Sequence, residues 1–184
     1  MDRFSTALLL AAAAGAPATP HLVPEGSEVV FTSRQMGVPV DGRFRRFDAQ
    51  VAFDPRQPAA ARIAVDVDLA SVSIGTAEIE AELAKPEWFD TRAHPRASFR
   101  STAVKPLGGA RFEVTGTLAM KGVAREVAVP VTLAPAGAHT TATGAFTVKR
   151  TDYRIGEGEW GDTSLVADEV RIRFALRLAG LPAP

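Results

Sequence analysis

The chain has 184 residues, a length that suits one domain with a sizeable core. Apolar residues make up 46% of it and charged residues 23%, as in an ordinary globular protein. Lysine plus arginine and aspartate plus glutamate both number 21, and this neutral balance argues against a broad nucleic-acid-binding surface. The absence of cysteine excludes disulfides, thiol catalysis and cysteine-ligated zinc.

The N-terminal segment has the pattern of an export signal. Arg3 precedes an apolar run over 7–14, and small residues follow at the positions that a signal peptidase reads. The run is too short to span a membrane. We therefore expect a signal peptide over 1–18, a linker over 19–26 and one folded domain over 27–180. The alternative for the first segment is a tail rich in alanine and proline.

Apolar residues then alternate with polar ones, which is typical of half-buried strands. The pattern predicts eight strands, over 29–31, 47–53, 63–69, 96–104, 112–120, 127–133, 141–148 and 170–178. Phe44 has the opposite parity to Phe47, so we expect a bulge between them or an outward Phe44. Pro130 has no N–H to donate, which predicts a bulge or an edge in the sixth strand. Lys121-Gly122 predicts a tight turn.

One segment breaks this rhythm. Residues 77–85 are good helix formers, and Ile79 and Leu83 stand four residues apart on one helix face. Thr76 can cap the helix and Pro86 can end it. The prediction is an all-β fold with one short helix. Eight antiparallel strands can close into a barrel, and a sandwich is the alternative that the pattern leaves open.

The sequence shows no catalytic or metal-binding constellation. The three histidines, His21, His94 and His139, have no ligand spacing, and no serine sits in a nucleophile elbow. Residues 156–161 fit G-x-G-x-x-G, but no helical pattern follows and glutamates flank the glycines, so we interpret them as a loop. We therefore expect no catalytic residue, no metal site, no cofactor and no enzyme activity.

What remains is the apolar interior, which either fills a dry core or lines a cavity for an apolar ligand. Small residues such as Gly116 and Ala97 leave room on the inward faces. If a lipid binds there, the residues that we expect to contact it are Phe31, Phe47, Val51, Phe53, Phe99, Phe112, Val114, Leu118, Val129, Val131, Phe146, Val148 and Phe174.

Five residues are candidates for the mouth of such a cavity. The parity of Arg125 turns it inward near a barrel end, where it either holds a polar headgroup or pairs with a carboxylate. Arg150 either orients the head or pairs with Asp152. Tyr153, Trp88 and Trp160 either line the mouth or plug the core.

Several motifs, in this order and spacing, carry a family resemblance. They are Gly42-x-Phe44-x-x-Phe47, Phe53-Asp54, Ala70-Ser71-Val72, Trp88-Phe89-Asp90, Pro95-x-Ala97-x-Phe99, Gly116-x-Leu118, Gly122-Val123, Arg125, Arg150-x-Asp152-Tyr153 and Asp168-x-Val170. With them the chain resembles the YceI-like family over about 29–178. It departs at Ile79-Glu80, where many relatives have Arg-Asp, and at Arg154, where glycine is common.

The resemblance implies a lipocalin-like eight-stranded antiparallel barrel with a helix at one end. It also implies a tunnel that binds a polyisoprenoid or an isoprenoid quinone in the periplasm, for transport, storage or sequestration. It links some members to membrane b-type cytochromes, so the alternative is a filled barrel that docks such a cytochrome or another envelope protein. The oligomeric state stays open, and a homodimer is compatible with the sequence.

Overall fold

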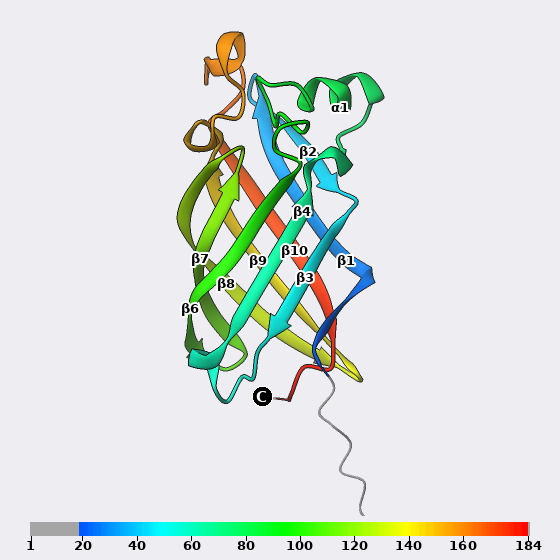
Figure 1. Cartoon of the computed structure of the whole chain (residues 1–184), viewed down its shortest axis with the longest axis vertical. Helices are drawn as coiled ribbons and strands as arrows, with labels where there is room; N and C mark the ends of the chain where they lie inside the picture. The colour runs from blue at the N-terminus through cyan, green and yellow to red at the C-terminus, as the bar shows by residue number, and fades with distance from the viewer. Residues whose placement is uncertain (1–18, 184) are drawn as a thin grey trace, which may run out of the picture.

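The computed structural model describes residues 19–183, so the expected signal peptide over 1–18 lies outside the described residues. The described chain is mostly strands, with one α-helix at one end of the molecule (Figure 1). The strands are β1 (His21–Gln35), β2 (Val38–Phe44), β3 (Phe47–Ala52), β4 (Arg62–Asp68), β5 (Val72–Ser73), β6 (Arg96–Gly108), β7 (Arg111–Met120), β8 (Val123–Ala136), β9 (His139–Lys149) and β10 (Glu169–Ala179).

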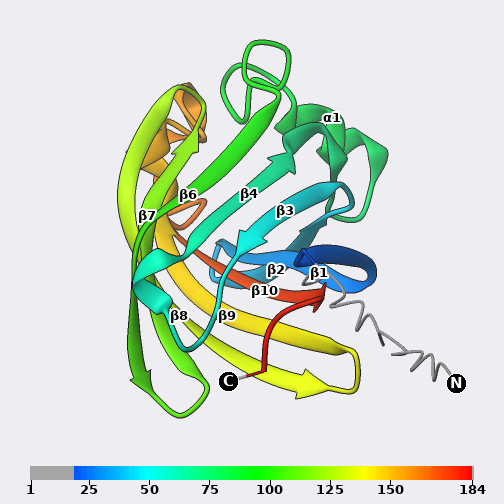
Figure 2. The same ribbon diagram turned by 60° about the horizontal axis from the view of Figure 1, so that its bottom comes forward.

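These strands close into an antiparallel barrel. Their order is β10-β9-β8-β7-β6-β4-β3-β1-β2-β5, and pairing between β10 and β1 completes the ring. Both β2 and β3 pair with β1, while β5 pairs with β2 and β4 with β3. β2 and β3 together therefore form one interrupted strand of the barrel, and β5 and β4 form another. The ten segments thus make an eight-stranded barrel; Figure 2 shows the sheet closing on itself. The eight-stranded barrel is confirmed, and the sandwich is not the fold.

The N-terminal part of the barrel differs from the expectation. Residues 21–26 were assigned to a linker, but they begin β1, because His21 to Val23 pair with residues 177–179 of β10. The strand β2 was missed altogether. Phe44 ends β2 and Phe47 begins β3, and the interruption between the two strands changes the alternation of inward and outward residues. Ser71 stabilises this interruption, because its Oγ accepts a hydrogen bond from the Arg46 N–H.

Pro130 lies at the end of a ladder. On the β7 side the pairing runs unbroken through Pro130, opposite Glu113. On the β9 side the ladder ends at Val131, opposite Gly144, so the first part of β8 is an edge there. This outcome agrees with the expected edge. A 3-10 helix, η3 (Arg150–Tyr153), follows β9 and lies against β8 and β9.

Alternation of side chains explains why these segments form barrel strands. Along β7 every second residue is buried, so one face lines the interior and the other faces outward. Aromatic rings cover glycines on neighbouring strands. A Cβ on Gly42 would stand 2.3 Å from the ring of Phe31, and one on Gly144 would stand 2.4 Å from the ring of Phe174. Both glycines are therefore needed for ring packing.

The helix α1 (Ala77–Leu83) begins where the sequence predicts. The Thr76 side chain accepts a hydrogen bond from the Ile79 N–H, which confirms the cap. The helix ends two residues earlier than expected. It lies at the same end of the barrel as the segment 150–166, and these two pieces flank one opening (Figure 1). Of the helices in residues 19–183, none has the length and apolarity to cross a membrane.

Candidate functional site: an apolar barrel interior and its mouth

The barrel holds two cavities. The one that α1 does not line, which we call the lower cavity, has a volume of about 180 Å³. Its wall is apolar apart from Ser98. Eleven of the predicted lipid-contacting residues line it, namely Phe31, Val51, Phe53, Phe99, Phe112, Val114, Leu118, Val129, Val131, Phe146 and Phe174. The interior is therefore not completely filled by side chains, and it offers an apolar ligand a wall without competing polar groups.

Three inward residues differ from the expectation. Val148 lines a second, upper cavity instead of the lower one, and Phe47 lines neither cavity. Phe47 packs beside the lower core cluster as a half-buried residue. Gly116 does not enlarge the interior, because the ring of Phe99 covers it and a Cβ there would stand 2.5 Å from that ring.

The upper cavity, of about 370 Å³, lies under α1 and the segment 150–166. Unlike the lower cavity it carries polar groups, from Ser33, Gln35, Glu78, Glu82 and Arg150. The side chain of Ile79 on its wall is 47% exposed, so the cavity reaches the surface there. This cavity is the mouth of the barrel. Its contribution from α1 was not expected from the sequence, which identified the helix but not what it covers.

The two cavities meet where they share lining residues. Phe31, Phe44, Met120 and Ile172 line both. The rings of Phe31 and Phe44 have centroids 5.6 Å apart in a tilted arrangement, so they pack against each other at this point. A ligand long enough to occupy both cavities has to pass between these side chains.

Arg150 is buried at the mouth and is 3% exposed. Its guanidinium has five N–H donors, and each has a backbone acceptor. The acceptors are the carbonyl oxygens of Ala167 (3.2 Å, from Nε), Ile155 (3.0 Å) and Gly156 (2.9 Å, both from Nη1), and Trp160 (2.8 Å) and Val166 (2.7 Å, both from Nη2). Burial lowers the pKa of Arg150, and the charge of Asp168 offsets part of this effect. Arg150 thus fastens the segment 155–167 and has no donor left for a ligand.

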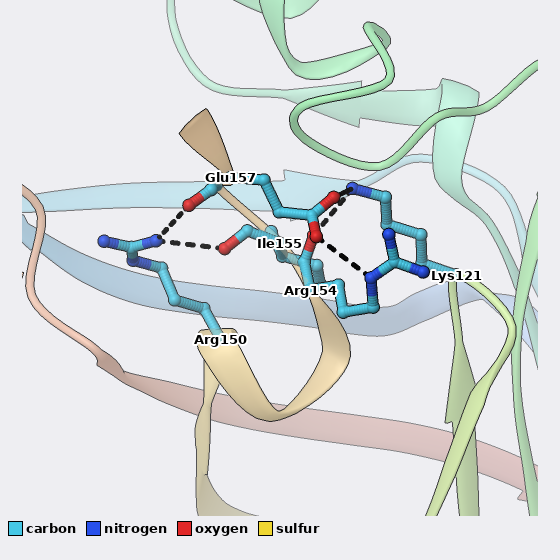
Figure 3. Close-up of polar contacts among 6 residues, drawn as sticks. Lys121, Arg150, Arg154, Ile155 and Glu157 are labelled. Carbon is cyan, nitrogen blue, oxygen red and sulfur yellow. Dashed lines mark hydrogen bonds and ion pairs between the residues drawn. The ribbon is translucent and has the colours of Figure 1, made fainter. Parts of the chain in front are cut away.

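A second anchor holds the same segment. The Lys121 side chain is only 5% exposed, and its Nζ donates to the Arg154 carbonyl (2.6 Å) and to Glu157 Oε2 (3.1 Å). Arg154 Nε donates to the other oxygen of Glu157 at 2.9 Å. Figure 3 shows Lys121 and Arg154 converging on one carboxylate beside Arg150. The sequence did not indicate that Lys121 and Glu157 form a pair, because 36 residues separate them.

Acid is expected to loosen this second anchor. Hydrogen bonds from Arg154 and then Lys121 hold the pKa of Glu157 below its ordinary value of 4.5. A carboxyl group with a lowered folded-state pKa adds stability above its unfolded-state pKa and loses it as the pH falls through the folded-state value. We therefore expect wild type to have a higher Tm than Glu157→Gln near neutral pH, with the gap closing below about pH 4. Thermal melts of both proteins across this range test it, and a gap independent of pH would contradict it.

The other candidate mouth residues take separate places. Arg125 pairs with Leu118 of β7 and so lies on the inward face of β8 as predicted, but it is exposed at the barrel end. Its Nη2 lies 3.9 Å from Asp152, which agrees with the alternative of a carboxylate partner. Tyr153 is 2% exposed and belongs to the core, where burial raises its pKa. Trp88 and Trp160 do line the upper cavity, with ring centroids 5.6 Å apart. The Trp88 Nε1–H is buried and has no hydrogen-bond partner among the described residues.

Residues 19–183 contain no group of three histidine, cysteine, aspartate or glutamate side chains that could hold a metal ion. Of the charged groups on the upper wall, Arg150 binds backbone carbonyls and Glu82 pairs with Lys85. Chemically, the site offers enclosure in a largely apolar space.

Comparison with known proteins agrees with this geometry. A family model described as the YceI-like domain matches residues 21–178. A UPF0312 protein of Azotobacter vinelandii is 35% identical over 88 residues, which are 48% of this chain and 46% of that protein. A UPF0312 protein of Pseudomonas putida strain GB-1 is 37% identical over 93 residues, which are 50% and 48% of the two chains. The chain thus spans about half the length of these curated relatives.

Solved structures share the fold. The crystal structure of Burkholderia cenocepacia BcnA is 43% identical, has a TM-score of 0.83, and aligns with 86% of this chain and 99% of that one. A polyisoprenoid binding domain from Saccharophagus degradans, implicated in plant cell wall breakdown, is 17% identical with a TM-score of 0.71. That alignment covers 89% of this chain and 99% of the other, and at this identity it shows the fold alone.

Proposed function

This chain belongs to the YceI-like family, and we propose that it binds a long apolar amphiphile, such as a polyisoprenoid or an isoprenoid quinone, inside its barrel. The function is carriage, storage or sequestration of that lipid in the periplasm, without catalysis. The observation that carries the proposal is the lower cavity, whose wall is apolar apart from one serine. Enclosing a tail there removes apolar area from water at roughly 25 cal/mol per Å².

The two cavities support a division of the ligand into tail and head. The lower cavity suits a hydrocarbon chain, whereas the upper one has polar groups and reaches the surface. A domain with the same fold is described as polyisoprenoid binding, which supports the choice of ligand class. The alternative of a filled barrel that docks a membrane cytochrome is less favoured, because it predicts no internal space.

The charges at the mouth favour a neutral head. Arg150, the basic residue on the described upper wall, has all its donors occupied, while Glu78 and Glu82 line the same wall. Burial of an unpaired anion is costly. We therefore expect a prenyl chain with a quinone or alcohol head to bind at least roughly tenfold more tightly than the same chain with a phosphate head. Calorimetric titration with the matched ligands tests this, and equal or tighter phosphate binding would contradict it.

The ligand itself can be identified directly. We would export the protein to a bacterial periplasm, purify it without detergent and record its native mass. A stoichiometric prenyl lipid or quinone in the organic extract would support the proposal and name the ligand class. A protein that carries no lipid, and that takes up neither quinones nor polyprenols on incubation, would overturn it.

A further inference from the structure

Exposed apolar side chains gather around the mouth of the barrel. Among residues 19–183 five large apolar side chains are strongly exposed, and four of them lie at this one end. They are Met36 (73% exposed), Val38 (62%), Ile79 (47%) and Leu165 (45%). The fifth, Leu107 (41%), lies at the end of β6, at the opposite end of the barrel. We call the four residues the apolar rim.

The rim residues come from three elements that meet at the upper cavity. Met36 and Val38 flank the tip of the β1–β2 hairpin, and Leu165 lies beside it, because its carbonyl accepts the Met36 N–H at 2.7 Å. Ile79, on α1, belongs to the wall of the cavity itself. The hairpin tip stands between the 150–166 segment and α1 (Figure 1). The apolar rim therefore lies beside the opening of an apolar interior, since Gln35, Val40 and Val166 next to it line the same cavity.

Met36 is a poor local choice for its position. Gln35 pairs with Val38, so Met36 and Gly37 form a two-residue hairpin turn, and both have positive φ, 46° and 80°. Such a turn favours glycine, which lacks the Cβ that is crowded at positive φ, or asparagine, whose short side chain can hydrogen-bond locally. Met36 thus adopts an unfavourable backbone conformation, as Lys121 does in the β7–β8 turn, and is also the most exposed of the large apolar residues. Lys121 binds Glu157 with its side chain, whereas the Met36 side chain is left in solvent, which is the feature that docking onto another surface would explain.

We propose that the apolar rim docks the mouth of the barrel onto the surface of a lipid bilayer, so that ligand passes between membrane and cavity without crossing water. This inference rests on the proposed function. The rim side chains would insert at the headgroup boundary, as those of interfacial amphipathic elements do. The contact is weak and reversible because only a few side chains take part, which suits a protein that must leave with its cargo.

Three observations favour a bilayer over a protein partner. The rim lies at the opening of the cavity, where a partner protein would block the exit. Its residues come from a hairpin tip, a helix and a loop. Exposed charges of both signs accompany it, such as Arg34 and Glu78, so it does not match a partner of one charge. Binding should therefore depend on apolar insertion and little on salt.

The test uses flotation of the whole exported protein with vesicles of zwitterionic phosphatidylcholine. Wild type is expected to float with the vesicles, at low and high salt alike. Met36→Asn should reduce its partitioning roughly tenfold, since one apolar side chain no longer inserts, while its Tm stays equal or rises because asparagine suits the turn. Val38→Thr, which keeps the β-branched shape, should reduce partitioning by a smaller factor. Leu107→Asn is the matched control and should float like wild type.

A ligand assay separates this inference from the proposed function. Wild type and Met36→Asn should bind a soluble short-chain quinone with equal affinity, while Met36→Asn should extract a long-chain quinone from vesicles more slowly. Failure of wild type to float, or equal flotation and extraction by the two proteins, would overturn the docking proposal alone. Dimerisation that Met36→Asn abolishes, without vesicle binding, would assign the rim to a second copy. Absence of ligand binding by either protein would instead overturn the proposed function.

Discussion

Replacement of Arg150 by lysine is expected to lower the free energy of unfolding by about 3 kcal/mol. The guanidinium donates to five carbonyls, and it is the larger of two anchors of a segment with little regular structure. Lysine keeps the charge but offers three donors from a single point, so buried carbonyls are left unsatisfied. Urea unfolding measures the loss. Both tryptophans of the chain, Trp88 and Trp160, lie at this end and report on it by fluorescence.

The matched control for this variant is Arg154→Lys in the same segment. Arg154 is 64% exposed, and its ion pair with Glu157 can be made by lysine, so we expect a change of less than about 0.5 kcal/mol. If Arg150→Lys unfolds at the same urea concentration as wild type, the carbonyl cage does not stabilise the mouth. If both variants are equally destabilised, the effect belongs to arginine in general and not to the cage.

Replacement of Val114 by tryptophan is expected to weaken lipid binding by roughly 100-fold while the barrel still folds. Val114 lies in the middle of β7, is 5% exposed and lines the lower cavity. An indole at this position would occupy much of the space of about 180 Å³ that the tail requires. We expect overpacking to cost about 1–3 kcal/mol of stability. Titration with a long-chain quinone measures the affinity, and circular dichroism confirms the fold.

Its neighbour Thr115 provides the control, because alternation along β7 turns it to the outer face. Thr115→Trp adds the same side chain to the same strand and should leave the affinity unchanged. Unaltered binding by Val114→Trp would mean that the lipid does not occupy the lower cavity. The ligand would then bind in the upper cavity alone.

Much of the barrel could be predicted from local patterns. Strands such as β7 and β10 alternate cleanly, because one face is buried and the other is wet. The tight turn at Lys121-Gly122 was also correct, since both residues have positive φ, 48° and 75°. Prediction failed at β2, where exposed residues such as Val38 and Pro39 blur the alternation. It also failed at residues 21–26, whose strand character depends on their β10 partners.

The inward face was easier to predict than the mouth. Parity along each strand placed eleven of thirteen candidate lipid contacts on the lower cavity wall. Parity placed Arg125 on the inward face of β8, and its pairing with Leu118 agrees. The side chain is nevertheless exposed and reaches Asp152 on η3, because β9 does not pair with this part of β8. Alternation gives the face on which a residue lies, but not whether that face is covered at the end of the barrel.

The sequence by itself determined that this protein has eight alternating strands, one capped helix and an apolar interior, because alternation and capping are local properties of the chain. Alternation left a sandwich open, and the pairing of β10 with β1 decided that the sheet closes into a barrel. Only the tertiary structure decided what the polar residues at the mouth do. Arg150 meets carbonyls up to 17 residues away, and Lys121 meets a carboxylate 36 residues away. Such contacts depend on how the barrel ends fold back on themselves, and no local pattern encodes them. The group of exposed apolar residues at the mouth likewise exists only once three distant segments meet.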